Sequence, residues 1–438
     1  MLMTQVCRYW RELALSTPGL WATFSAEPEC NHDVALIEKW LQLSGCYPLC
    51  IFLRLDCEDK VAAAALDLAL EYRPRWQNIM IDWQLDDCVP RFITWPGEVA
   101  IRETLPLLET FVLHTSFDID MGDLDDEVGP QLDMLLAGAP RLRKFHWDAL
   151  QFYMDMDPAE FPRANFASLT DLKLTCLLSV DECIAMLART PLLETCSFNY
   201  VREDAPMPFT TPLQPISEQL VLPRLHTLSL DTDCDIVPFL EAITLPALSS
   251  VAIDFRHNMG DLDSPFLEDD FHDWPHDAFM ALLTRSKCAL SSLSLCVPIS
   301  EHELGGLLHA CASTLKHVTV QGKVGWDIAH ERTVRLLTHT RGEGAVYFPL
   351  LTCVRLYDCI VHPLPPQELA NMVHSRLYMT HGAPSPPGDV EVALRVRPDI
   401  IPISDEHRLA AMQTLCGKMG GTKLEVETLL TPARIRSD

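Results

Sequence analysis

The sequence predicts an α/β solenoid, in which short parallel strands alternate with helices along the chain. Three observations support this fold class: a strand pattern that recurs ten times, a proline before most of its occurrences, and helix-like segments between them. Such an internal repeat takes precedence over other signals in assigning a fold. The chain has 438 residues, of which 48% are hydrophobic, so it is long enough to bury a large core.

The recurring unit is an apolar residue followed by apolar residues three and five positions later. Because side chains alternate between the faces of a strand, the last two point into the core and the residue between them points away. That residue is polar or alanine in eight units, and Met80 and Val112 are the exceptions. The units are Trp76-Ile79-Ile81, Leu108-Phe111-Leu113, Leu142-Phe145-Trp147, Leu169-Leu172-Leu174, Leu193-Cys196-Phe198, Leu225-Leu228-Leu230, Leu248-Val251-Ile253, Leu290-Leu293-Leu295, Leu315-Val318-Val320 and Leu351-Val354-Leu356.

Proline stands two positions before the first apolar residue in seven of the ten units. It is tolerated there because the first residue of a strand does not need an N–H donor. The spacing between units runs from 23 residues, between Leu225 and Leu248, to 42, between Leu248 and Leu290. This range is typical of irregular leucine-rich repeats with insertions on the outer face. The prolines are Pro74, Pro106, Pro140, Pro191, Pro223, Pro246 and Pro349.

Helical patterning between the units predicts that each repeat adds a strand to a parallel sheet and a helix to a layer behind it. The connections are expected to be right-handed. Before the first unit, the pattern predicts a helix over 34–44, a strand over 48–55 and a helix over 61–72. The helical segments between units are residues 131–137, 179–188, 278–284 and 300–310.

We expect three parts in the chain: a short helical region over 1–25, the repeats over 33–375, and a loop with a helical tail over 376–438. The Pro/Gly-rich residues 382–388 predict the loop, and residues 405–416 predict the helix. Two acidic insertions interrupt the repeats, at residues 118–127 and 261–273.

The composition argues against several classes of partner. A formal net charge of −27 does not suit a nucleic-acid surface or docking on anionic lipid. No apolar run of about eighteen residues predicts a transmembrane helix, and no secretory signal pattern is present. The 16 cysteines are scattered without framework spacing, which favours reduced thiols in a cytoplasmic or nuclear protein.

No motif predicts catalysis, a metal or a cofactor. The acidic run from residue 118 lacks the glycine and glutamate positions of a calcium loop. The sequence contains neither G-x-S-x-G nor H-E-x-x-H. One cysteine-rich stretch lacks the paired knuckles of a structural zinc site, and its residues are Cys30, His32, Cys46, Cys50 and Cys57. We therefore expect a protein that is not an enzyme.

The residues that flank the inward pair of each strand predict a polar surface. In a repeat array such residues form a continuous face that can bind a protein or peptide. The alternative is that they are simply the solvated side of a half-buried sheet. The candidates for substrate binding are Lys144, His146, Lys173, Asn199, Asp231, His317, Gln321, Arg355 and Tyr357.

Residues 6–21, before the repeats, predict a short amphipathic helix and a second apolar anchor. Val6, Trp10 and Leu13 share one helix face because they stand at positions i, i+4 and i+7. Pro18 ends the helix. So short a helix cannot bury its tryptophan and the one that follows by itself, so it must pack on the rest of the chain, on a partner, or on both.

This segment resembles the second half of an F-box, in the form found in large fungal families of F-box proteins with leucine-rich repeats. The resemblance rests on V-C-R-x-W-R-x-L-A-L-S-T-P-x-L-W and covers sixteen residues. In the family an earlier helix, usually opened by Leu-Pro, precedes this motif, and the present sequence starts after it. The positions that the resemblance assigns to the F-box core and docking face are Val6, Cys7, Trp10, Leu13, Leu20 and Trp21.

The resemblance implies an irregular leucine-rich-repeat solenoid, a curved parallel sheet with helices on its outer face, preceded by a short helical F-box remnant. It also implies a substrate-recognition subunit of a cullin-based (SCF-type) ubiquitin ligase. The remnant would dock on the adaptor subunit, and the repeats would hold a protein substrate. The alternative is a non-catalytic interaction scaffold that does not engage the ligase, with residues 6–21 as an N-terminal cap. A hydrolase hidden among the histidines is a third hypothesis.

Overall fold

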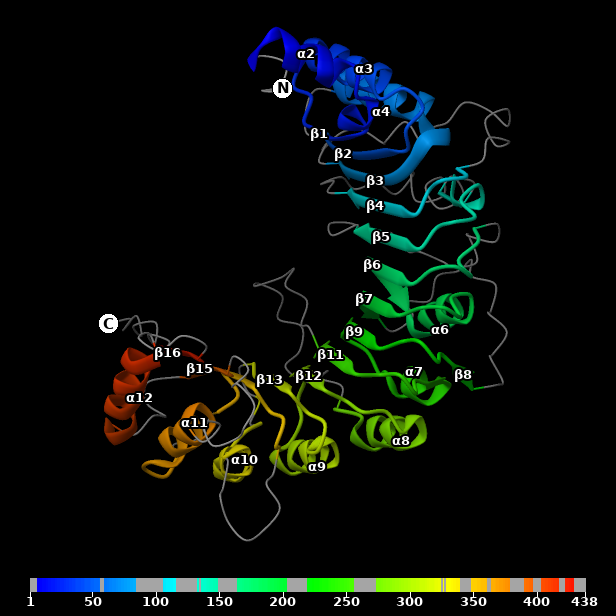
Figure 1. Cartoon of the computed structure of the whole chain (residues 1–438). Helices are drawn as coiled ribbons and strands as arrows, with labels where there is room; N and C mark the ends of the chain where they lie inside the picture. The colour runs from blue at the N-terminus through cyan, green and yellow to red at the C-terminus, as the bar shows by residue number, and fades with distance from the viewer. Residues whose placement is uncertain are drawn as a thin grey trace, which may run out of the picture. The chain divides into compact units, whose positions relative to one another are not determined.

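The chain folds into two compact units in the computed structural model, Met1–Leu225 and His226–Asp438 (Figure 1). We call them unit 1 and unit 2. Their boundary falls inside the predicted repeat region of residues 33–375. The structure describes residues 6–55, 59–83, 105–115, 132–133, 135–148, 164–202, 219–255, 273–323, 326, 328–338, 348–360, 364–378, 390–396, 403–416 and 422–428.

Unit 1 is built on a parallel sheet whose strands lie side by side in chain order. Each strand pairs in parallel with the next one. A further short strand, β8 (Leu220–Val221), follows near the end of the unit. The strands of the sheet are β1 (Thr23–Ala26), β2 (Leu49–Leu55), β3 (Trp76–Trp83), β4 (Thr110–Thr115), β5 (Lys144–Asp148), β6 (Asp171–Ser179) and β7 (Thr195–Arg202).

The helices of unit 1 gather mostly at its N-terminal end. The predicted helices over 34–44 and 61–72 correspond to α3 (Asn31–Leu43) and α4 (Asp59–Glu71). α6 (Val180–Ala188) begins where predicted, because Ser179 and Glu182 form a capping box: each side chain accepts a hydrogen bond from the other's backbone N–H. The described part of unit 1 also contains α2 (Arg8–Leu15), the 3₁₀ turns η1 (Pro18–Trp21) and η2 (Arg73–Arg75), and helical residues at 132–133 and 135–137, inside the predicted helix over 131–137.

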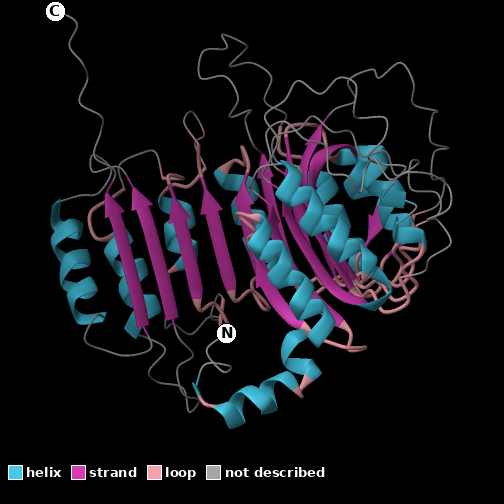
Figure 2. Cartoon of the chain, turned by 90° about the horizontal axis from the view of Figure 1, so that it is seen from above, coloured by secondary structure: helices cyan, strands magenta, loops and turns pink. Residues whose placement is uncertain are grey.

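Unit 2 repeats the same construction with a parallel sheet in chain order. Figure 2 shows its strands as arrows that run in one direction. The short strand β10 (Ile243–Thr244) lies outside this sheet. The strands of the sheet are β9 (Thr227–Thr232), β11 (Ser250–Phe255), β12 (Ser292–Cys296), β13 (His317–Gln321), β14 (Cys353–Tyr357), β15 (Val390–Val396) and β16 (Thr422–Thr428).

Helices cover one face of the unit 2 sheet, and α8 to α12 lie along the same side of β11 to β16 (Figure 1). α9 begins at a second capping box, formed by Ser300 and Glu303. The helices are α7 (Val237–Ala242), α8 (His276–Ser286), α9 (Glu301–Cys311), α10 (Glu331–Leu337), α11 (Glu368–Tyr378) and α12 (Ile403–Cys416). The predicted α/β class, with a parallel sheet and helices between its strands, is confirmed.

The apolar residues of the ten predicted units form the core. All thirty are buried, and none is more than 4% exposed. The register aligns them across strands, so that Ile79, Phe111, Phe145, Leu172 and Cys196 are successive partners in unit 1. Burying one such side chain contributes roughly 1.5–3 kcal/mol. The recurring pattern therefore marks the residues of both sheets that pack into the core.

The C-terminal part differs from the prediction of a loop and a helical tail over 376–438. Its helix is α12, but β15 and β16 continue the parallel sheet of unit 2. The repeat pattern misses both strands because Asp389 and Gly421 stand where the first apolar residue belongs. Pairing with β14 nevertheless buries Val392 and Leu394. The acidic insertion at 118–127, residues 261–272 of the other insertion, Cys57 and the loop at 382–388 lie outside the described residues.

Candidate functional site

The N-terminal helix of unit 1 exposes most of its large apolar side chains. α2 buries only Ala14, although a short amphipathic helix normally turns its apolar face to the core. The exposed fractions of the large side chains on and beside it run from 44% to 70%. We call this surface the docking patch, and its residues are Val6, Tyr9, Trp10, Leu13, Leu15, Leu20 and Tyr47.

Trp21 fixes the docking patch to the body of unit 1. Its indole Nε1 donates a hydrogen bond to the Ala14 carbonyl oxygen at 2.8 Å. Ser16 and Thr17 donate to the Leu13 carbonyl at 3.0 and 2.7 Å, which satisfies acceptors at the end of the helix. Five of the six residues that the F-box resemblance assigns are exposed, and Trp21 is half-buried as the internal anchor; the exposed ones are Val6, Cys7, Trp10, Leu13 and Leu20.

The loop after α3 supports the other side of the docking patch. The Tyr47 ring lies beside η1, where a Cβ on Gly19 would meet it at 3.5 Å. Arg75 donates to the Tyr47 carbonyl at 3.0 and 2.8 Å and to the Ser44 hydroxyl at 2.6 Å. Burial lowers the pKa of the Arg75 guanidinium. These bonds hold an exposed aromatic residue next to η1.

The face of each sheet that is turned away from the buried apolar pairs is the polar face. In unit 1 it carries a charge network: Lys144 Nζ and His146 Nε2 contact Asp171 at 3.1 and 2.9 Å. Lys173 Nζ lies 3.8 Å from Asp148. Partial burial raises the pKa of the Asp171 carboxyl, but hydrogen bonds and charges from His146 and Lys144 outweigh it, so this pKa lies below its usual value. The predicted basic residues therefore contact acidic residues of the neighbouring strand.

The polar face of unit 1 has an apolar end that sequence reasoning missed. Asn199 Nδ2 donates to the Thr175 hydroxyl at 3.0 Å at the β7 end. Toward β2 the same face carries Phe52, Met80 and Val112, which are successive register partners. The two exceptions in the repeat pattern, Met80 and Val112, were the signal for this apolar stretch.

The polar face of unit 2 contains a cavity of about 710 Å³ that spans five successive strands. It includes two of the predicted residues, His317 and Arg355. Sequence reasoning missed Glu391 and Lys423 because it missed β15 and β16. The lining residues are Ser292, Ser294, His317, Thr319, Thr352, Cys353, Arg355, Val390, Glu391 and Lys423.

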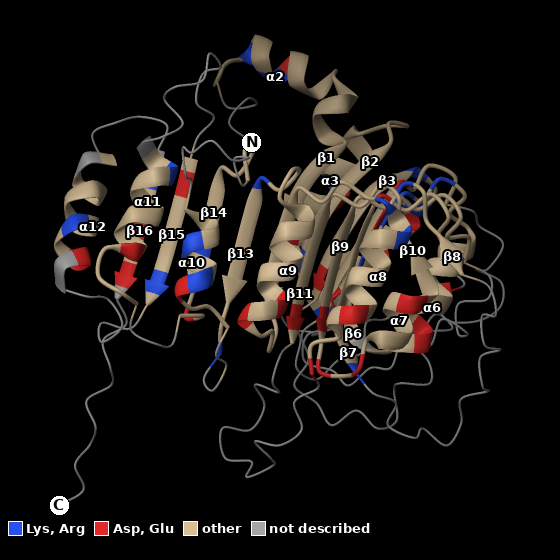
Figure 3. Cartoon of the chain, turned by 90° about the horizontal axis from the view of Figure 1, so that it is seen from below, with Lys and Arg blue, Asp and Glu red and all other residues tan. Residues whose placement is uncertain are grey.

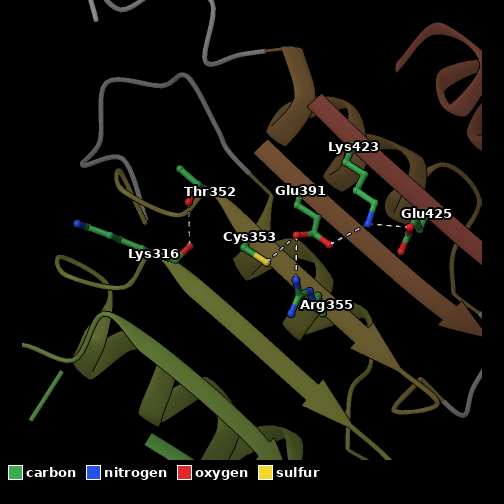
Figure 4. A network of polar contacts seen from close by, with 7 residues as sticks. All are labelled: Lys316, Thr352, Cys353, Arg355, Glu391, Lys423 and Glu425. Carbon is green, nitrogen blue, oxygen red and sulfur yellow. Dashed lines mark hydrogen bonds and ion pairs between the residues drawn. The ribbon is translucent and has the colours of Figure 1, made fainter. Parts of the chain in front are cut away.

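One wall of this cavity is a chain of alternating charges (Figure 4). Arg355 Nη2 lies 2.9 Å from Glu391, Lys423 Nζ lies 3.8 Å from the same carboxylate, and Lys423 Nζ lies 2.8 Å from Glu425. The hydrogen bond from Arg355 lowers the pKa of Glu391, and burial raises the pKa of the Cys353 thiol. β15 and β16 carry both acidic and basic residues (Figure 3). The chain of alternating charges contains two basic and two acidic residues, so its four charges balance.

The opposite wall offers uncharged hydrogen-bonding groups. Ser292, Ser294 and Thr319 present hydroxyls, and His317 presents an exposed imidazole. These four side chains make no hydrogen bond with another residue that the structure describes. Hydroxyls and a neutral imidazole both donate and accept, so the cavity can bind peptide backbone or uncharged polar side chains.

The other candidates of unit 2 lie on the polar face outside this cavity. Asp231 is only 4% exposed, so it does not offer the accessible carboxylate that the sequence predicts. Strand alternation sets the face of a residue but not its depth, which depends on neighbouring segments. Gln321 and Tyr357 are half-buried, and the Arg395 guanidinium lies 5.2 Å from the centre of the Tyr357 ring.

The described residues contain no group of three or more His, Cys, Asp or Glu side chains placed to hold a metal ion. In the same part of the chain, no helix combines the length and the apolar content that a membrane crossing needs. No protein-family model matches the sequence, and no curated protein matches it either.

Proposed function

We propose that this protein is a leucine-rich-repeat substrate receptor of a cullin-based (SCF-type) ubiquitin ligase. The docking patch binds the adaptor subunit, and the polar faces of the repeats bind a protein substrate. The chain contributes no catalytic step, because ubiquitin transfer belongs to other subunits. The single observation that carries the proposal is an F-box-like segment whose large apolar side chains are exposed.

The exposure of the docking patch favours a partner over a capping role. A helix that only caps a core would bury Trp10 and Leu13, yet these side chains are 47% and 44% exposed. Several large apolar side chains that are exposed on one short stretch of a folded protein favour an interaction site. Tryptophan and tyrosine side chains also contribute most to affinity in interfaces, and the patch contains Trp10, Tyr9 and Tyr47.

The polar faces support the second half of the proposal. Their strands present hydroxyl, imidazole and paired charged groups on a regular lattice, which suits recognition of an extended protein segment. The cavity of unit 2 suits such a segment, because one wall carries balanced charges and the other has uncharged donors and acceptors.

Co-purification with the adaptor subunit tests this function. We expect the full chain to associate with the adaptor, and we expect the double variant Trp10→Ala, Leu13→Ala to lose that association while its circular dichroism spectrum stays unchanged. The control is Leu350→Ala in unit 2, which removes a leucine of similar exposure.

Two outcomes contradict the proposal. If the folded wild-type chain does not associate with the adaptor, the interaction-scaffold alternative is favoured. If association survives the double variant, the docking patch is not the contact surface.

A further inference from the structure

A second cavity, of about 480 Å³, lies in unit 1 where β5, β6 and β7 begin. Arg143, Thr170 and Glu194 each stand directly before one of these strands. Their backbone groups extend the sheet by one position: Arg143 N donates to the Glu109 carbonyl at 2.9 Å, and Glu194 N donates to the Thr170 carbonyl at 2.9 Å. The floor of the cavity is therefore held in place by the sheet. The lining residues are Glu109, Pro140, Arg141, Arg143, Ser168, Thr170, Leu192, Glu194 and Arg224.

Three arginine residues line this cavity, although the chain as a whole has a net charge of −27. Arg141, Arg143 and Arg224 are all exposed. Among the described residues, no ion pair joins any of them to Glu109, Glu194 or another acid. Three positive and two negative charges leave the cavity with a net charge of +1. An arrangement with this excess can accept one more negative group.

We propose that this arginine cavity binds the carboxylate of an aspartate or glutamate side chain on a partner protein segment. Guanidinium groups bind carboxylates through paired, charge-assisted hydrogen bonds. One carboxylate balances the net charge, whereas a phosphate dianion would bring an excess of negative charge close to Glu109 and Glu194. The exposed Leu192 and Pro140 give the neighbouring residue of the segment an apolar wall.

This inference rests on the proposed substrate-receptor function, because it names a chemical class of segment that the repeats recognise. The cavity lies at the edge of the sheet where these strands begin, one residue before Lys144 and Asp171 of the polar face. A segment that crosses the polar face of unit 1 can therefore place an acidic side chain in the arginine cavity.

Fluorescence anisotropy with short peptides tests the inference directly. The probes are capped at both ends and differ only at a central position next to leucine, which is glutamate, glutamine or phosphoserine. We expect the full chain to bind the glutamate peptide about fivefold to tenfold more tightly than the glutamine peptide. We also expect the affinity to fall as salt is added, because exposed charges are screened.

Variants of the cavity identify the site. Arg143→Gln should reduce the preference for glutamate, and Arg332→Gln on α10 is the matched control, because it removes an exposed arginine that does not line the cavity. The double variant Glu109→Gln, Glu194→Gln should strengthen binding of the glutamate peptide, a gain that a misfolded protein cannot produce.

Equal affinity for the glutamate and glutamine peptides overturns the inference, and so does an unchanged preference in Arg143→Gln. If the phosphoserine peptide binds more tightly than the glutamate peptide, the cavity binds a phosphate group, and the proposal of a carboxylate ligand is overturned. The assay contains no adaptor subunit. A chain that fails to bind the adaptor but prefers the glutamate peptide would therefore contradict the proposed function and support the arginine cavity. A chain that binds the adaptor but shows no preference for the glutamate peptide would overturn the arginine cavity and leave the proposed function standing.

Discussion

The docking patch and the polar face of unit 2 are surfaces of opposite character. The patch displays large apolar side chains, among them tryptophan, tyrosine and leucine. The polar face carries charges that are already paired, such as Arg355 with Glu391 at 2.9 Å, and hydroxyls in regular rows. The first surface gains free energy mainly by leaving water, whereas the second gains little from burial and selects by geometry.

Under the proposed function, this difference corresponds to two separate roles, one for each surface. An apolar patch that buries several aromatic residues supports a stable contact with one fixed partner. Water molecules can hydrogen-bond to the paired charges and hydroxyls of the polar face until a matching protein segment displaces them. Such a surface suits weaker and more selective contacts.

If the docking patch serves binding, its exposed apolar residues contribute little to the free energy of unfolding, whereas buried apolar residues contribute much. Leu172 is fully buried on β6, and its neighbour Lys173 lies on the polar face. We expect Leu172→Ala to lower the free energy of unfolding by about 2–5 kcal/mol. Lys173→Ala should cost less than about 1 kcal/mol, and Trp10→Ala less than about 0.5 kcal/mol. Urea denaturation of the three variants measures these values, and a Trp10→Ala loss as large as that of Leu172→Ala would show that α2 is part of the core.

Adaptor affinity is the corresponding test of the patch. We expect the double variant Trp10→Ala, Leu13→Ala to weaken binding by about a hundredfold, since central aromatic residues of an interface commonly contribute 2 kcal/mol or more each. The polar-face variant Arg355→Ala should leave the adaptor affinity unchanged. Calorimetric titration of the full chain with the adaptor gives both numbers, and a similar loss in the two variants would remove the distinction between the surfaces.

Arg75 connects the patch to the body of unit 1. Arg75→Met removes the hydrogen bonds to the Tyr47 carbonyl and the Ser44 hydroxyl, and we expect a loss of about 1.5–3 kcal/mol in the free energy of unfolding. Ser44→Ala removes only one of these acceptors and should have a smaller effect. Thermal denaturation compares them, and equal melting temperatures for wild type and Arg75→Met would show that the Arg75 contacts contribute nothing to stability.

The charge wall of the unit 2 cavity should respond to pH. Because Arg355 holds the pKa of Glu391 below its unfolded value, the pair stabilises the folded state above about pH 4.3, and this contribution is lost as the pH falls toward the lowered folded pKa. The difference between wild type and Glu391→Gln should be below about 1 kcal/mol at neutral pH and should become smaller as the pH falls below about 4.3. Denaturation midpoints from pH 3 to 7 measure it, and a difference independent of pH would contradict the pairing.

Much of the fold follows from local sequence. The ten apolar units predict strands because alternation with fixed spacing leaves one burial pattern, and all thirty residues are buried. The capping boxes at Ser179 and Ser300 fix the starts of α6 and α9 for equally local reasons. β15 and β16 were missed because they lack the first apolar residue of the unit, and only pairing with β14 and with each other makes them part of the sheet.

The candidate sites divide in the same way. The sequence determined which residues lie on the polar faces, because that depends only on alternation along each strand. It also determined the F-box-like motif, whose role stays a prediction. Tertiary structure decided that Asp231 is buried, that Arg355 is neutralised by Glu391 from the next strand, and that Trp10 is exposed while Trp21 is an anchor. Depth and partnership depend on residues far apart in the chain, so no local pattern can specify them.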